Sequence, residues 1–438
     1  RQTVRREKRR YEARGQLPLL DSLRRSPRRF WSMYKERESA GGGFTMAEVQ
    51  RHWQSVLAGS GRGALSERAP GDVPELIAGL AERTAAGRLS AALRRDADAL
   101  NAPFSEGHVQ AAMIRMRAGA AAGLDGIGAC HLKEAWNLRG AGEHKVREYV
   151  LPSHITTVVN KVFSGRYPSH WGEVPVSAIF KKGDQGDLDN YRPIAVNSIL
   201  AKISSELIRS RLDDFCEKHG FRAKGQAGFR PGRRTSDHVF LLKHLIDRHR
   251  LHARARMFCC FVDFQKAYDS VDRGLMLDRL ADMGLSGNML RTIADMYYHA
   301  RLTPRLGPIL GVPFHSTCGV RQGDPLSPLL FGVFIDQFEA FAAERASQVG
   351  VTLGVGFGGE LLRVLLYADD MVLMASDAAG LQRLLEVLEE FCTTYNMRVN
   401  IGKTEVVVFG RKACQPTQGP PEWTYRGAPL RVSAEFKY

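Results

Sequence analysis

Leu365 to Met374 reads LLYADDMVLM, in which two apolar runs flank the adjacent carboxylates Asp369 and Asp370. Successive strand residues point to opposite faces, so both carboxylates can face one site only if a tight turn falls at them. The stretch therefore predicts a hairpin with LLY and MVLM as its arms. Two like charges about 4 Å apart repel by about 4 kcal/mol at an effective dielectric near 20, and a divalent cation would reverse that cost. The alternative is an Asp-rich surface turn.

A third carboxylate follows a strand about a hundred residues earlier. Met257 to Val262, MFCCFV, has the pattern of a buried strand, with Asp263 at its exit and Tyr268 five residues later. A charge at the end of a buried strand is costly unless something pairs with it. Carboxylate oxygens without His or Cys suit Mg²⁺, and two such ions can clamp the attacking and leaving oxygens of a phosphoryl displacement. The sequence thus predicts a site for two Mg²⁺ ions, with Mn²⁺ as a possible substitute.

Two cations are predicted on a second hairpin. Residues 171–182, WGEVPVSAIFKK, alternate as a strand does, and Gly183-Asp184 turn the chain towards residues 190–193, NYRP. Pairing of these segments would bring Lys181 and Arg192 near each other. Arg supplies a fork of donors and Lys a point charge, which together suit a triphosphate. An ordinary exposed basic pair is the alternative. A carboxylate site for two metal ions together with cations that hold a triphosphate indicates nucleotidyl transfer.

Composition agrees with a polyanionic partner. The 438 residues include 62 Lys and Arg against 47 Asp and Glu, a net charge of +15, which favours nucleic acid. The length allows two or three domains. No apolar run reaches the roughly 18 residues of a membrane span, so we expect no membrane association. The seven cysteines contain no CxxC pair, so neither a disulfide framework nor a zinc site is indicated.

The N-terminal part is basic and predicted to be helical. Up to Arg29 there are eleven Lys and Arg against three Asp and Glu, followed by Phe30, Trp31 and Tyr34. This stretch suits a nucleic-acid arm with stacking residues, or a solvated basic helix. Thr45 to Glu48 then forms a capping box for a short amphipathic helix, and residues 60–72 read as a linker.

Two loops complete the candidate site. Residues 226–234, QAGFRPGRR, form a basic loop in which Arg230, Arg233 and Arg234 would follow a nucleic-acid backbone, unless it is a plain turn. In GVRQGD, Gln322 stands beside Gly323, whose missing side chain allows a flat base or sugar to approach closely.

Several segments follow one another along the chain in a specific order: LDGIGACHLK, IFKKGDQGDLDNYRPIAV, QAGFRPGRRTSDH, FVDFQKAYDSVD, GVRQGDPLSPLLF, LLYADDMVLMASD and MRVNIGKTEVVVF. These segments resemble the successive motifs of a reverse transcriptase, in the wording of non-LTR (LINE-type) retrotransposons. They cover roughly residues 101–438. Any one of them would be weak evidence, but their order and spacing are specific.

The resemblance implies roles for the acidic cluster and its surroundings. Asp263 and Asp369 resemble the metal-bridging pair, with Asp370 as a supporting carboxylate and the backbone of Phe264 near the metals. Tyr268 stands where the family places an aromatic ring that crowds the sugar 2′ position and so selects deoxynucleotides.

The resemblance extends to the nucleotide-binding residues. Lys181 and Arg192 match the triphosphate-binding pair, and Gln322 with Gly323 matches the loop under the incoming nucleotide and template. Lys403 resembles a basic residue that protonates departing pyrophosphate; a surface lysine at a strand start is the alternative.

The implied fold is an α/β (α+β) right-hand polymerase. We expect a basic helical extension over residues 1–100, fingers over 101–256, and a palm with an antiparallel sheet over 257–438. The sequence stops at Phe436-Lys437-Tyr438, where the family's primer grip begins, so the thumb is expected to be absent or truncated. Because the sequence also starts at Arg1, we interpret it as a piece of a longer protein.

The implied function is RNA-directed DNA synthesis with an RNA template, a DNA primer or target, and dNTPs. In a full-length element this would be target-primed copying, with an endonuclease elsewhere in the protein. We expect cytoplasmic synthesis and a nuclear site of action, although no targeting signal is identified. The alternatives are a group II intron or retron-type enzyme, and a domesticated or fossil copy that binds RNA without catalysis.

Overall fold

The computed structural model describes residues 43–58, 77–80, 82, 89–137, 150–251, 256–349, 353–410 and 423–434. Three predicted features lie outside these residues: the basic stretch up to Arg29, the linker at 60–72, and the start of a primer grip at Phe436-Lys437-Tyr438. Within the described residues, none of the helices has both the length and the apolar character needed to cross a membrane.

Helices and strands are mixed along the chain, as the predicted α/β class requires. The helices up to residue 251 are α4 (Met46–Leu57), α6 (Ala91–Ala99), α7 (Glu106–Arg115), α8 (Ala129–Asn137), α9 (Val150–Ser164), α10 (Ser169–Gly172), α11 (Ile199–Lys218) and α12 (Thr235–Leu251). The later ones are α13 (Arg273–Asp282), α14 (Gly287–Tyr298), α15 (Ser327–Ile335), α16 (Gln337–Val349) and α17 (Ala378–Thr394).

The first sheet has the strand order β2-β1-β4-β5, with β6 also paired to β4. Its strands are β1 (Glu173–Phe180), β2 (Tyr191–Ala195), β4 (Arg301–Leu306), β5 (Ile309–Leu310) and β6 (Phe314–His315). β1 runs antiparallel to β2 and parallel to β4. The predicted hairpin is therefore present, although its first strand begins at Glu173 because residues 169–172 form the single turn α10.

Helix α4 packs against this sheet. The predicted capping box is confirmed, since the Glu48 amide donates to Thr45 Oγ1 over 3.3 Å and the Thr45 amide donates to the Glu48 carboxylate over 2.8 Å. Val49, Trp53 and Leu57 are buried on one helix face and join a cluster with Val174 and other residues of the sheet. This part of the predicted N-terminal extension is thus built into the first sheet's core.

The second sheet has the strand order β14-β11-β3-β10-β9. Its strands are β3 (Arg256–Val262), β9 (Val364–Tyr367), β10 (Asp370–Ala375), β11 (Glu405–Gly410) and β14 (Arg431–Ser433). Neighbouring strands are antiparallel, as predicted, except that β14 runs parallel to β11 at the edge. Two separate hairpins, β7 (Val355–Phe357) with β8 (Glu360–Leu362) and β12 (Thr424–Tyr425) with β13 (Ala428–Pro429), lie outside both sheets.

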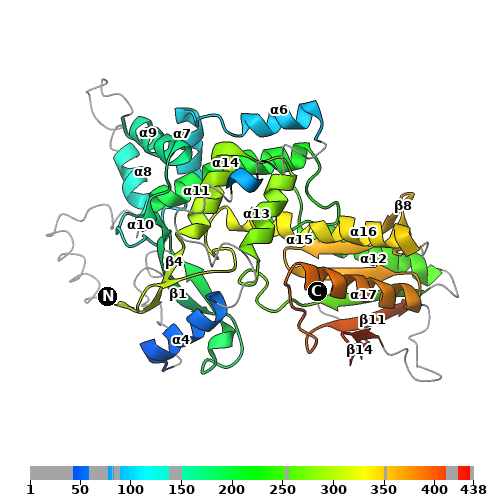
Figure 1. The fold of residues 1–438 in the computed structure, drawn as a ribbon. Helices are drawn as coiled ribbons and strands as arrows, with labels where there is room; N and C mark the ends of the chain where they lie inside the picture. Colours follow the sequence, from blue (N-terminus) through cyan, green and yellow to red (C-terminus); the bar gives the residue numbers. More distant parts are fainter. Residues whose placement is uncertain are drawn as a thin grey trace, which may run out of the picture.

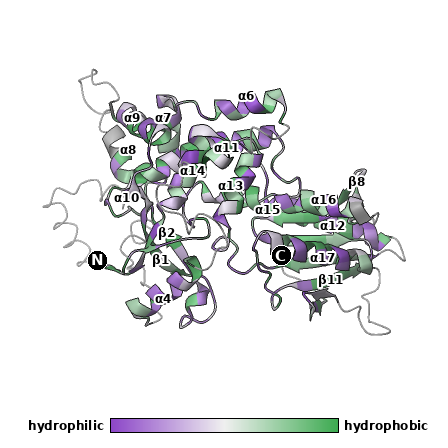
Figure 2. Cartoon of the chain, in the orientation of Figure 1, coloured by the Kyte–Doolittle hydropathy of each residue, from purple (hydrophilic) through white to green (hydrophobic). Residues whose placement is uncertain are grey.

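Both faces of the second sheet are covered. Cys259 and Phe261 of β3 share a cluster with Leu242 and Leu245 of α12, whereas Cys260 and Val262 belong to the large core that contains the apolar face of α17. Alternating residues of β3 therefore face different helices. Burial on both sides explains the unbroken apolar run MFCCFV, and Figure 2 shows hydrophobic strands between helices of mixed hydropathy.

The chain leaves the second sheet after β3 and returns to the first. Helices α13 and α14 follow, and β4 then pairs with β1, so one boundary near residue 256 does not separate the two sheets. Figure 1 shows the first sheet with α4 at one end and the second sheet with α12, α16 and α17 at the other. The segments that meet between them carry the predicted site residues.

Candidate active site

Asp369 lies at the tip of a two-residue turn. Asp370 pairs with Tyr367 in the β9–β10 ladder, which leaves Ala368 and Asp369 as the central residues of the turn. Ala368 has φ of +58°, a left-handed conformation that is uncommon for a residue other than glycine. The predicted hairpin is confirmed, with Asp369 in its turn and Asp370 as the first residue of β10.

The register between β3 and β10 brings Asp263 to this turn. Met371 pairs with Val262, so the next position along each antiparallel strand places Asp263 beside Asp370. Burial raises the pKa of Asp369, and the negative charge of Asp263 raises it further. Burial also raises the pKa of Asp370, as do the charges of Asp369 and Asp263. The structure therefore brings the three predicted carboxylates into one electrostatic cluster.

The predicted cations face this cluster from the first sheet. Ile179 pairs with Arg192, and the Lys181 amide donates to the Asn190 carbonyl over 2.8 Å, so Lys181 lies two positions beyond the pair. Both cations are solvent-exposed. Their positive charges oppose the effect of burial on the pKa of Asp369, and that of Lys181 does the same for Asp370. The cations of the first sheet are thus close enough to the carboxylates of the second sheet for their charges to interact.

The carboxylates fit a divalent cation by their chemistry. They are oxygen donors without His or Cys, and they repel one another. None of the three forms an ion pair with another described side chain. The described residues contain no group of three or more His, Cys, Asp or Glu side chains close enough to hold an ion by themselves. A hard divalent cation can complete its shell with water and substrate phosphates, so this donor set is compatible with such a cation.

Phe264 and Lys403 lie along the backbone next to Asp263. Phe264 is buried and forms an isolated antiparallel bridge with Val399. The Asn400 amide donates to the Asp263 carbonyl over 2.7 Å, which holds the turn containing Lys403 against the end of β3. Lys403 itself is exposed, and β11 begins two residues later at Glu405.

Tyr268 is held between two aromatic rings near Asp369. Its ring stacks on Phe331 with centroids 4.4 Å apart and meets Phe229 edge-on at 6.3 Å. Its hydroxyl is buried and has no hydrogen-bond partner among the described residues. Burial raises the pKa of Tyr268, and the negative charge of Asp369 raises it further. A bulky ring is thus fixed beside the acidic cluster.

Gln322 and Gly323 are tied to the strand that carries Arg192. The Ala195 amide of β2 donates to the Gln322 carbonyl over 2.7 Å. Gly323 has φ of +104°, and a Cβ there would lie 2.6 Å from the Ala195 carbonyl oxygen, so the turn requires glycine. The side-chain amide of Gln322 donates to Asp269 Oδ1 over 2.9 Å. The structure thus adds Asp269, which sequence reasoning missed, although it stands in FQKAYDSVD beside Tyr268.

Arg230, one of the predicted nucleic-acid contacts, has partners within the protein. Arg230 donates two hydrogen bonds to the Glu217 carboxylate, over 2.7 and 2.6 Å, and others to the carbonyls of Ala223 and Gln226. Its side chain is only 7% exposed, and its role toward nucleic acid stays a prediction. Arg233 and Arg234 are exposed, and their predicted role remains a prediction.

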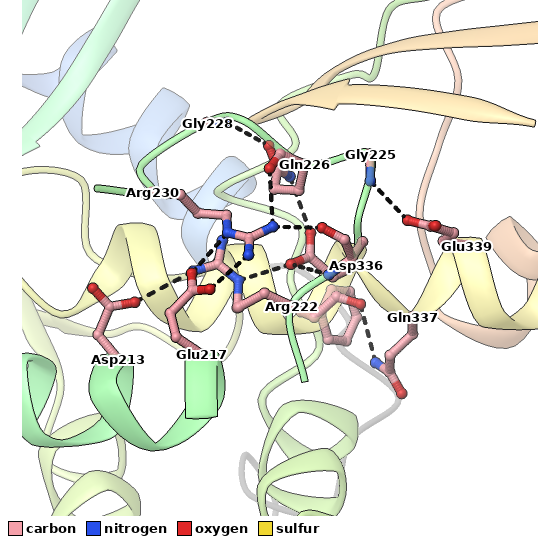
Figure 3. Close-up of polar contacts among 12 residues, drawn as sticks. Asp213, Glu217, Arg222, Gly225, Gln226, Gly228, Arg230, Asp336, Gln337 and Glu339 are labelled. Atoms are coloured by element: carbon pink, nitrogen blue, oxygen red, sulfur yellow. Dashed lines mark hydrogen bonds and ion pairs between the residues drawn. The ribbon is translucent and has the colours of Figure 1, made fainter. Parts of the chain in front are cut away.

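A buried polar network behind the hairpin was also missed. It joins Arg222, Gln226 and Asp336, and Figure 3 shows it with Arg230 and Glu217 at its edge. Its signal in the sequence is the glutamine that opens QAGFRPGRR, a segment predicted to be a basic loop.

Comparison with protein families identifies this arrangement. The family model described as reverse transcriptase (RNA-dependent DNA polymerase) matches residues 179–438, which include Lys181, Arg192 and the three carboxylates. Members of this family generally use divalent metal ions. The match confirms the resemblance that the ordered motifs indicate.

Curated relatives come from mobile elements. The chain is 27% identical over 318 residues to the "Transposon TX1 uncharacterized 149 kDa protein" of Xenopus laevis, covering 72% of this chain and 23% of that protein. It is 27% identical to the probable RNA-directed DNA polymerase from transposon BS of Drosophila melanogaster, covering 62% of this chain and 29% of the relative. It is 28% identical to the Pol polyprotein from the type-1 retrotransposable element R2 of Popillia japonica, covering 55% of this chain and 32% of that protein. The chain therefore spans only between 23% and 32% of the length of these relatives.

Proposed function

The chain belongs to the reverse transcriptase (RNA-dependent DNA polymerase) family, and from this premise we propose that it is the polymerase part of a non-LTR retrotransposon protein. The reaction is addition of deoxynucleotides to a primer 3′ hydroxyl with RNA as the template. The β3–β10 register carries this proposal, because it places Asp263 beside the Asp369–Asp370 turn, and the charges of Lys181 and Arg192 act on Asp369 in that turn.

In this proposal the second sheet is the palm and the first sheet belongs to the fingers. The palm carries all three carboxylates, and the hairpin β1–β2 of the fingers carries the two cations. Helix α4 supports the fingers from the N-terminal side, through its packing against the sheet.

The carboxylates of Asp263 and Asp369 would hold two divalent ions, Mg²⁺ or in its place Mn²⁺, with Asp370 and the backbone of Phe264 in support. When bound, these ions would stabilise charge on the attacking and leaving oxygens. Lys181 and Arg192 bind the triphosphate, with the guanidinium able to take two phosphate oxygens at once.

The remaining residues act on the substrate's sugar, base and leaving group. The ring of Tyr268 would occupy the space beside the 2′ position of the incoming sugar. Its stacking on Phe331 supports this role, because the stacked ring is held in place. Gln322 and Gly323 lie under the incoming nucleotide, and Lys403 supplies a proton to departing pyrophosphate.

The proposed partners are an RNA template, a DNA primer or target, and dNTPs. In the full-length protein we propose target-primed copying with an endonuclease elsewhere in the chain, and a nuclear site of action after cytoplasmic synthesis. The relatives named for transposon BS and element R2 support this proposal over a group II intron or retron-type enzyme.

The test is Asp369→Asn in the full-length protein, measured as Mg²⁺-dependent extension of a DNA primer on an RNA template. Removing one charge from the cluster should lower extension by at least about 100-fold, as loss of a group that stabilises transition-state charge typically does. Asp98→Asn on the exposed surface of α6 is the matched control. Extension near the wild-type rate would contradict the metal assignment. Wild-type protein that binds RNA but never extends a primer would support the non-catalytic alternative.

A further inference from the structure

The turn that carries Asp369 needs support from outside the hairpin. Ala368 precedes Asp369 and has φ of +58°, a conformation that a residue with a Cβ holds only when its surroundings determine it. Its amide is buried and points away from the β9–β10 ladder, so this amide must find a partner elsewhere.

Gln226 provides that partner. Its side-chain oxygen accepts from the Ala368 amide over 3.0 Å and from the Gly228 amide over 2.7 Å. Its side-chain nitrogen donates to Asp336 Oδ1 over 3.0 Å. Gln226 is completely buried. One side-chain amide therefore joins the turn of the hairpin to the C-terminal end of α15.

The backbone around Gln226 is pressed against β9. The Leu366 amide donates to the Gly225 carbonyl, and the Ala227 amide donates to the Leu366 carbonyl, each over 2.8 Å. A Cβ at Gly228 would lie 2.2 Å from the Ala368 nitrogen, and one at Gly225 would lie 2.4 Å from the Val364 oxygen. Only glycine allows this approach, so the loop follows the hairpin as closely as a neighbouring strand.

A buried ion pair sets the orientation of the Gln226 amide. Asp336 Oδ2 accepts from Arg222 Nε over 2.8 Å and from the Ala223 amide over 3.2 Å, and both side chains are at most 1% exposed. Because the Asp336 carboxylate can only accept, it selects the NH₂ end of Gln226. The amide oxygen is then directed at the Ala368 amide. Figure 3 shows the contacts that lead from Gln226 through Asp336 to Arg222.

We infer that Gln226 is a positioning residue, which holds the Ala368 turn and thereby places Asp369 and Asp370 for metal binding. Asp336 and Arg222 act through it by fixing its amide. The expected effect on Mg²⁺-dependent extension rests on the proposed function. The expected effect on amide exchange at Ala368 can be measured without any reaction.

The first test is Gln226→Glu in the full-length protein, which replaces the donor facing Asp336 with a second carboxylate. We expect the backbone amide of Ala368 to exchange with solvent at least about 10-fold faster, as measured by hydrogen exchange with mass spectrometry over the β9–β10 turn. We also expect a rise of at least about 3-fold in the Mg²⁺ concentration for half-maximal extension, with affinity for the primer–template changed less than twofold.

The rescue variant exchanges the two groups. In Gln226→Glu with Asp336→Asn, the new Asn amide can donate to the new carboxylate and still accept from Arg222, so donors, acceptors and net charge of the pair are restored. Exchange at Ala368 and the Mg²⁺ dependence should both return to within about twofold of wild type. Gln337→Glu, one residue from Asp336 but in contact with Phe334 and Tyr395 instead of the hairpin, is the matched control.

Two results would overturn the inference: unchanged exchange at Ala368 in folded Gln226→Glu, or a swap variant that regains its melting temperature but not its Mg²⁺ dependence. If Gln226→Glu does not fold, Gln226→Met removes the same hydrogen bonds without adding charge and is judged by the same exchange measurement. If the wild-type protein shows no extension at all, the proposed function fails, while exchange at Ala368 still decides whether Gln226 holds the turn.

Discussion

Replacing the buried carboxylate of Asp269 by an amide should stabilise the protein at neutral pH. Asp269 is 7% exposed and accepts one hydrogen bond from the Gln322 side chain. Burial raises the pKa of Asp269 to about 6, although the Gln322 hydrogen bond and the charge of Lys266 oppose that change. In Asp269→Asn the side chain keeps an oxygen acceptor for Gln322 and has no charge to desolvate.

The magnitude follows from the difference between the folded and unfolded pKa. A rise from 3.8 to about 6 corresponds to about 3 kcal/mol, since each pKa unit is worth about 1.4 kcal/mol. The folded protein binds this proton more tightly than the unfolded chain. The stability that comes from the protonated Asp269 side chain is therefore fully present below pH 3.8 and is lost as the pH rises through about 6. The variant should exceed wild type by up to about 3 kcal/mol above pH 7, and the difference should shrink towards zero near pH 4.

Urea unfolding of wild type and Asp269→Asn at several pH values between 4 and 8 measures this difference directly, because other titrating groups cancel in the comparison. Asp98→Asn makes the same chemical change at an exposed position and should show no comparable pH-dependent gain. A stability difference for Asp269→Asn that does not change with pH would refute the reasoning, as would a variant less stable than wild type at pH 7.5.

Further substitutions at Tyr268, at the arginines of the basic loop and at Gly228 test these assignments. Tyr268→Ala should relax discrimination against ribonucleotides in single-nucleotide extension assays and cost about 2–4 kcal/mol in urea unfolding from lost ring packing, while Tyr268→Phe should do neither. Arg230→Ala should cost about 1–3 kcal/mol of unfolding free energy, because it leaves a carboxylate and two carbonyls without their donor. Arg233→Ala with Arg234→Ala should leave stability nearly unchanged and instead weaken RNA binding, measured by filter binding at several salt concentrations. Gly228→Ala should lower the melting temperature and extension together, because its Cβ would clash with the hairpin backbone; normal extension would show that the loop can shift.

Local pattern was enough for several elements. The capping box at Thr45, the apolar run before Asp263 and the two arms around Asp369 each encode their structure within about ten residues, because strand alternation and helix capping depend on near neighbours. The ordered motifs added the family, which the match over residues 179–438 confirms.

Contacts between segments far apart in the sequence could not be predicted from local pattern. The return of β4 to the first sheet was not predicted, because no residue in Arg301–Leu306 specifies which strand it pairs with. Arg230 was assigned to nucleic acid because its sequence neighbours are basic, whereas its position beside Glu217 is determined by how the loop packs against α11.

By itself, the sequence determined the hairpin, its two carboxylates and the family of the chain, since these depend on residue types in a fixed order. Only the tertiary structure decided that Asp263 lies beside Asp370 through the β3–β10 register, and that Gln226 binds the amide of Ala368. Both contacts join residues more than a hundred positions apart. Their formation depends on strand register and on the need to satisfy every buried donor and acceptor, conditions that arise only once the chain is packed.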